Sequence, residues 1–157
     1  MSVKPPDFHL EHFLPYLVHR VGSRLAEGFK DGFDEVGLNL QEWRAAAVLY
    51  EFGPQTMGDI ARRTNINAST MTRLIGQMEK NGLVERERPM ANQRNVYVRL
   101  LEEGSRRVQT LIPKVIDYET DLSACFSDAE LQTFKLLLEK LFHSLVRDTP
   151  DTERLAG

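Results

Sequence analysis

Four apolar residues at helical spacing in the middle of the chain place the strongest constraint on its fold. They fall at positions i, i+3, i+4 and i+7, so they share one face of a helix that must be buried. The four are Met71, Leu74, Ile75 and Met78. Asn67 is a residue type that caps helix starts, and Gly82 can end the helix because glycine adopts left-handed backbone angles cheaply. The sequence therefore predicts a short amphipathic helix after Asn67.

A second, shorter helix is predicted directly before it. Thr56 and Asp59 have the spacing of a capping pair, and Ile60 follows as an inward-facing residue. The polar run from Asn65 to Asn67 supplies a turn between the two helices. A short helix, a tight turn and a second helix form a helix-turn-helix.

The face opposite the apolar row is the first candidate functional surface. Its side chains are small or form hydrogen bonds, and no acidic residue occurs between Ala68 and Met78. Such a face suits entry into the major groove of DNA, where arginine pairs with guanine and glutamine with adenine. An ordinary solvated polar face is the alternative. The candidate DNA-binding residues on it are Ala68, Ser69, Thr70, Thr72, Arg73 and Gln77.

The periodicity then changes to that of β-strands. Residues 83–88 and 95–100 are predicted strands joined by the polar loop 89–94, which makes a β-hairpin. Placed next to a helix-turn-helix, such a hairpin is a wing. Arginine is attracted to narrow minor grooves, so Arg88, Asn92 and Arg94 join the candidate DNA-binding residues.

Amphipathic helices are predicted at both ends of the chain. One apolar stripe runs from Leu10 to Leu25 and includes Pro15, where we expect a helix start or a kink. Asn39 and Glu42 open the next helix as a capping box. Two long helices follow the hairpin, at about residues 102–125 and after Ser127, so the predicted order is ααααββαα. The stripes at the two ends pack either within the chain or against a second copy.

Charge is distributed unevenly, and this matters more than the net charge of −3. From Gly58 to Arg99 there are eight basic and four acidic residues, a net charge of +4, whereas the remainder carries −7. A basic middle can follow phosphates while acidic ends keep the protein soluble. The 157 residues suffice for a single domain, residues 1–157.

Composition bounds the remaining possibilities. We expect no membrane span, because no apolar run approaches about 18 residues, and the start of the chain lacks the apolar core of a secretory signal. The single cysteine, Cys125, fits a cytoplasmic protein without a disulfide framework, and its apolar neighbours predict a small filler in the core. His9 and His12 have no second ligand cluster, so no metal and no cofactor are expected. No nucleophile elbow or phosphate-binding glycine loop occurs, so we predict no enzyme.

The middle of the chain resembles a known family. The stretch Ser69–Arg86 is similar to the recognition helix and first wing strand of MarR-type regulators, whose usual sequence pattern there is close to S-T-V-T-R-L-V-x-x-L-E-x-x-G-L-V-x-R. The resemblance implies a mainly α fold with a small β-hairpin wing, a winged helix-turn-helix at about residues 39–101, and dimerisation helices at about residues 8–36 and 102–147. It also implies a homodimer that acts as a ligand-responsive repressor by binding a palindrome in double-stranded DNA. The wing departs from the usual Asp-x-Arg, since Asn92 stands where the acid that orients Arg94 is common.

The resemblance also implies how such a protein is controlled. Many relatives release DNA when a small aromatic or phenolic anion, or its coenzyme A thioester, binds between the dimerisation and DNA-binding parts. Cationic and hydrogen-bonding groups beside aromatic ones make a plausible anion site. The candidate effector-binding residues are His12, Tyr16, His19, Arg20, Trp43 and Arg44. Two alternatives stay open: a cysteine-based redox sensor, and a winged-helix adapter that binds proteins and not DNA.

Overall fold

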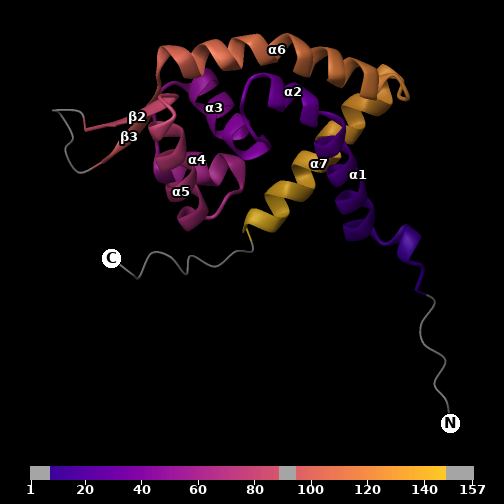
Figure 1. Cartoon of the computed structure of the whole chain (residues 1–157). Coiled ribbons are helices and arrows are strands. Elements are labelled where there is room, and N and C mark those ends of the chain that lie inside the picture. The colour runs from indigo at the N-terminus through magenta and orange to yellow at the C-terminus, as the bar shows by residue number, and fades with distance from the viewer. Residues whose placement is uncertain (1–7, 89–94, 148–157) are drawn as a thin grey trace. The chain divides into compact units, whose positions relative to one another are not determined.

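A computed structural model describes residues 8–88 and 95–147. It divides into two compact units, Met1–Val115 and Ile116–Gly157, and the boundary falls inside the long helix Glu102–Ser123. Figure 1 gives the order of the elements along the chain.

The N-terminal stripe forms a helix that starts at the proline. A single 3₁₀ turn, η1 (Leu10–His12), precedes α1 (Leu14–Gly28), and Pro15 lies in the first turn of α1. Proline fits there because the first amide groups of a helix have no intrahelical partner. A separate helix that the sequence did not predict, α2 (Lys30–Glu35), follows α1 and buries Phe33.

Three helices, α3 (Leu40–Phe52), α4 (Met57–Thr64) and α5 (Ala68–Lys80), begin at the predicted caps. The side chain of Asn39 accepts hydrogen bonds from the backbone amides of Gln41 and Glu42, and the Glu42 carboxylate accepts one from the backbone amide of Asn39, so the capping box is confirmed. Thr56 caps α4, where its hydroxyl accepts a hydrogen bond from the backbone amide of Asp59. Between α4 and α5, Asn65 takes left-handed backbone angles (φ +53°), which closes the tight turn.

The predicted hairpin is confirmed, and a third strand joins it. Strands β2 (Val84–Glu87) and β3 (Tyr97–Leu100) pair antiparallel, with Arg86 opposite Val98. The two-residue strand β1 (Gln55–Thr56) pairs with the other edge of β3, giving the order β1-β3-β2. The predicted order of elements lacked β1 and α2 and is corrected here. In Figure 1, β2 and β3 extend side by side away from α4 and α5.

Two long helices complete the chain. Helix α6 (Glu102–Ser123) contains Pro113 in its interior, and α7 (Asp128–Arg147) begins after Ser127. The backbone amide of Ser127 donates to the Glu130 carboxylate at 2.8 Å, and the backbone amide of Glu130 donates to the Ser127 hydroxyl at 3.4 Å, so these two residues form a capping box.

The hydrophobic core lies in the first unit and includes the apolar face of α5. All four of its residues are buried: Met71, Leu74, Ile75 and Met78. They pack with α3 residues such as Ala45 and Leu49, with Val98 of β3 and with Val108 of α6. Burying this face of α5 leaves its opposite face at the surface, which positions the site.

Candidate nucleic-acid interface

The N-terminus of α5 is held by Asn67. Its side-chain oxygen accepts hydrogen bonds from the backbone amide of Thr70 at 2.8 Å and from the hydroxyl of Ser69 at 2.9 Å. Asparagine at this position satisfies amide groups that would otherwise have no partner, so the first turn of α5 is well defined. The residues that begin the helix therefore have fixed directions.

The predicted contact residues of α5 lie together on one face. Thr70 is half-buried, and the other five are exposed: Ala68, Ser69, Thr72, Arg73 and Gln77. The hydroxyl of Thr72 donates to the carbonyl oxygen of Ala68 at 2.9 Å, and the residue also carries a methyl group on this exposed face. The amide of Gln77 donates to Asn81 at 3.2 Å, so its carbonyl oxygen is not used by that bond. The face thus combines a methyl group, a guanidinium and an amide.

A shallow hollow of about 250 Å³ runs alongside this face. It brings Thr70, Arg73 and Gln77 of α5 next to Asn39 and Gln41 at the start of α3. The sequence alone does not predict that the start of α3 lies at the site. Its capping box can be recognised from sequence, but a capping box does not indicate which other helix lies beside it.

The wing is described only at its base. Arg88, directly after β2, is exposed. Asn92 and Arg94, the other predicted wing contacts, lie outside the described residues.

The charges of the basic segment are reduced by ion pairs within it. Arg62 pairs with Asp59, Arg86 pairs with Glu79 at 2.9 Å, and Arg99 pairs with both Glu85 and Glu87. A hydrogen bond from Thr56, reinforced by Arg62, lowers the pKa of Asp59. All four acidic residues of the segment are therefore neutralised locally.

Four cations of this segment take part in none of these ion pairs. Within the described part of the chain, Arg73, Lys80 and Arg88 form no ion pair. Arg63 also lacks one there, and its guanidinium lies 3.9 Å from the ring centroid of Phe52. Two of the four, Arg73 and Lys80, lie on α5, and Arg88 lies at the base of the wing, where their charge is available to a polyanion.

The predicted effector residues are spread over three elements. The guanidinium of Arg20 lies 5.4 Å from the ring centroid of Tyr16 on α1, where His19 is exposed, and His12 is exposed in η1. On α3, Trp43 packs partly buried against the core and Arg44 is exposed. Neither of the two hollows described here includes any of the six.

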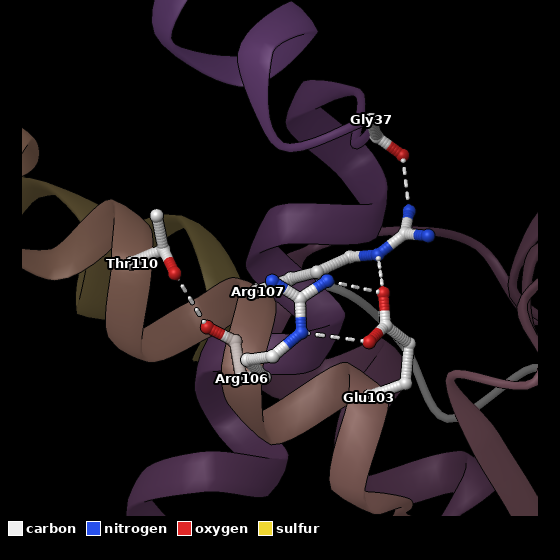
Figure 2. A network of polar contacts seen from close by, with 5 residues as sticks. All are labelled: Gly37, Glu103, Arg106, Arg107 and Thr110. Atoms are coloured by element: carbon white, nitrogen blue, oxygen red, sulfur yellow. Dashed lines mark hydrogen bonds and ion pairs between the residues drawn. The ribbon is translucent and has the colours of Figure 1, made fainter.

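A second hollow, of about 370 Å³, lies between the turn after α2 and the start of α6. Figure 2 shows the polar network on its wall. Glu103 accepts hydrogen bonds from Arg106 at 2.7 and 2.8 Å and from Arg107 at 2.8 Å, and Arg107 also reaches the carbonyl oxygen of Gly37. The hydrogen bonds from Arg106 and then Arg107 lower the pKa of Glu103 to about 2.

Three further observations concern the described residues 8–88 and 95–147. Cys125 is exposed, so its assignment as a core filler was wrong; its thiol donates to the carbonyl oxygen of Leu122. No three histidine, cysteine or acidic side chains gather there as a metal site. No helix in these ranges has the length and apolar character needed to cross a membrane.

Known proteins resemble this chain in sequence and in fold. The sequence profile of the MarR family matches residues 36–94. An uncharacterised HTH-type transcriptional regulator of Bacillus subtilis, YsmB, is 40% identical over 99 residues, which cover 63% of this chain and 68% of the relative. The homoprotocatechuate degradative operon repressor of Escherichia coli is 29% identical over 103 residues, or 66% of this chain and 70% of that protein.

A solved structure shares the fold at lower sequence identity. The crystal structure of NadR in complex with 4-hydroxyphenylacetate aligns with a TM-score of 0.74 at 22% identity, covering 90% of this chain and 97% of that one. This match extends the likeness from the central segment to almost the whole length of the chain.

Proposed function

Because the chain belongs to the MarR family of transcriptional regulators, we propose that it is a homodimeric repressor whose α5 helices read a palindromic DNA operator. The observation that carries this proposal is the exposed face of α5. It holds Thr72, Arg73 and Gln77 without an acidic residue, and Lys80 at the end of α5 and Arg88 directly after β2 form no ion pair within the described residues. Such a face suits base edges in the major groove, and Lys80 and Arg88 suit the flanking phosphates.

Exposed apolar surface supports the homodimer. Helix α1 buries none of its residues, and Leu14, Val18 and Val21 are between 42 and 54% exposed. Helix α7 of the second unit likewise exposes Phe134 and Leu137. Apolar stripes of this size favour a partner surface, and a second copy of the chain is the partner that a palindromic operator calls for.

A small aromatic or phenolic anion, or its coenzyme A thioester, is the proposed effector class. The aromatic rings of Tyr16 and Trp43 and the cations Arg20 and Arg44 are suited to a carboxylate on an aromatic ring. NadR, which shares the fold, is seen with 4-hydroxyphenylacetate. To act as an inducer, the anion must bind the form that does not hold DNA more tightly than the form that does. The other proposed residues of this site are His12 and His19.

Selection of bound sequences from a random duplex pool tests the DNA-binding function. We expect the purified full-length protein, at near-physiological salt, to enrich a palindrome whose half-sites are about one helical turn apart. An enriched sequence without two-fold symmetry would contradict the homodimer. A folded protein that enriches no duplex, with or without 4-hydroxyphenylacetate, would favour the adapter function instead.

A further inference from the structure

Arg86 lies in wing strand β2, yet its polar partners are on α5. Its backbone amide donates to Glu79 Oε1 at 3.1 Å, and its guanidinium Nη1 donates to Glu79 Oε2 at 2.9 Å. A second guanidinium nitrogen, Nη2, lies 3.4 Å from the carbonyl oxygen of Thr72. One carboxylate of α5 therefore holds both the main chain and the side chain of a single strand residue.

The guanidinium lies against α5 between two residues of that helix that it contacts. Thr72 is seven positions before Glu79, and both are contacted by Arg86. A Cβ added at Gly76, between them, would meet Arg86 Nη2 at 3.8 Å, so the guanidinium packs on the helix at this glycine. Because Arg86 of β2 meets α5 at Thr72, Gly76 and Glu79, these contacts constrain both the distance between the strand and the helix and the direction of the strand.

The other ion pairs of the hairpin do not reach α5. Arg99 of β3 pairs with Glu85 and Glu87 of β2, so these contacts hold the two strands to each other. Because successive strand residues point to opposite faces, Glu85 and Arg86 lie on opposite sides of the hairpin. The hairpin thus has one internal set of ion pairs and one pair that attaches it to the helix.

Exposure indicates that the attaching pair contributes little to stability. The side chains of Arg86 and Glu79 are 33% and 37% exposed, and ion pairs at such exposure are weakened by solvent. Its geometric consequence is larger, because β2 ends at Glu87 and Arg88 follows it directly. The direction of β2 decides where Arg88 lies relative to Thr72, Arg73 and Gln77.

We propose that Glu79 and Arg86 are positioning residues that set the angle between α5 and the wing, so that both contact one DNA half-site together. This role rests on the proposed DNA-binding function. Neither residue needs to touch DNA for it: Glu79 acts through Arg86, and Arg86 acts through the strand. Preorganised orientation of two contact elements raises the affinity for a specific site, because less freedom is lost on binding.

The variant E79Q separates this role from simple electrostatics. It removes a negative charge beside the DNA-facing surface, which by charge alone tightens binding to any duplex. The positioning role predicts the opposite sign for the selected palindrome: about tenfold weaker binding, within the usual range of coupling between contacting residues. The matched control is E85Q, which removes the same charge from β2, next to Arg86 in the sequence but on the face of the hairpin away from α5.

The measurements are the dissociation constants for the selected palindrome and for a scrambled duplex, with the thermal unfolding midpoint recorded for each variant. We expect E79Q and R86Q to weaken only palindrome binding, and the double variant E79Q/R86Q to be no worse than either single change. E85Q is expected to bind the palindrome as tightly as the unsubstituted protein or more tightly. The midpoints of all four variants are expected to stay close to that of the unsubstituted protein.

Other results overturn the assignment in distinct ways. Weaker binding of R86Q with unchanged or tighter binding of E79Q would make Arg86 a direct phosphate contact. Equal losses on both duplexes together with a lowered midpoint would make the pair merely structural. If E79Q and E85Q behave alike while the unsubstituted protein binds its palindrome, only the positioning role fails; if the unsubstituted protein enriches no duplex, the DNA-binding function fails first and the role with it.

Discussion

The guanidinium of Arg107 donates a hydrogen bond of 3.0 Å to the carbonyl oxygen of Gly37, which lies 70 positions earlier in the chain (Figure 2). Gly37 closes the turn between α2 and α3 with φ at +63°, a backbone angle that side chains with a Cβ adopt rarely. The same guanidinium is held from the other side by Glu103 at 2.8 Å. A side chain of α6 thereby fixes the turn that leads into α3.

Replacing Arg107 by alanine is expected to lower the free energy of unfolding by about 1 kcal/mol. The loss comes from two charge-assisted hydrogen bonds, reduced by the partial exposure of the side chain. Urea unfolding at neutral pH measures the change. Arg106→Ala is the control, because Arg106 also binds Glu103 but makes no bond to Gly37; similar losses for the two variants would remove the Gly37 bond from the argument.

Because of the Glu103 carboxylate, the stability of the folded protein is expected to decrease at low pH. Its pKa is lowered from 4.5 to about 2 in the folded protein by hydrogen bonds from Arg106 and Arg107, so folding favours the charged form. The stabilisation is complete above the unfolded-state pKa and is lost as the pH falls through the folded-state pKa. The difference in unfolding midpoint between the unsubstituted protein and E103Q should therefore shrink as the pH falls from about 5 to 2. A difference that stays constant over this range would contradict the lowered pKa, which NMR titration of the carboxyl group reports directly.

Gly104→Ala is expected to be strongly destabilising, by roughly 3 kcal/mol or more. A Cβ at Gly104 would lie 2.2 Å from the carbonyl oxygen of Leu83 and 2.8 Å from Cδ2 of Leu100. The Leu83 carbonyl is also bound by the amide of Leu101 at 2.9 Å, so it cannot move away freely. Gly58→Ala is the matched control in α4, since the nearest atom to its added Cβ is 4.0 Å away. Thermal unfolding should separate the two variants clearly, and equal midpoints would refute the close approach.

Gln77→Ala is expected to change which bases are preferred at one position of each half-site. A lost base-edge contact costs discrimination of roughly 1–3 kcal/mol at that position and little elsewhere. Repeating the selection from a random pool with the variant measures the preference position by position. A uniform loss of affinity over all sequences would place Gln77 outside the base-reading set.

Arg88→Gln is expected to weaken binding to all duplexes alike. A phosphate contact contributes by releasing counterions, so removing one reduces the slope of log affinity against log salt by about one. Binding at four or five salt concentrations gives the slope. Arg24→Gln on α1 is the control, because Arg24 is exposed and pairs only locally with Glu27; an unchanged slope for Arg88→Gln would assign that side chain to solvent.

Some of the architecture was not predictable from sequence, for identifiable reasons. Strand β1 has two residues, too few for any periodicity, and it exists only because β3 offers an unpaired edge about 40 positions later. The six residues of α2 are likewise too short to show a helical period, and Phe33 alone marks their buried side. Cys125 sits among apolar neighbours in the sequence but is exposed in the structure, because apolar neighbours do not ensure burial when the helix end faces solvent.

The sequence by itself determined the local features: where α3, α4, α5 and α7 begin, and which face of α5 is buried. Caps and helical stripes depend on residues within one or two turns of each other, so they can be recognised without knowing the fold. Only the tertiary structure decided how these elements are joined. It pairs Arg86 with Glu79 across a strand and a helix, binds Arg107 to Gly37, and sets the start of α3 beside Arg73. Such contacts depend on the directions in which packed elements meet, and residues far apart in sequence carry no local signal of that meeting.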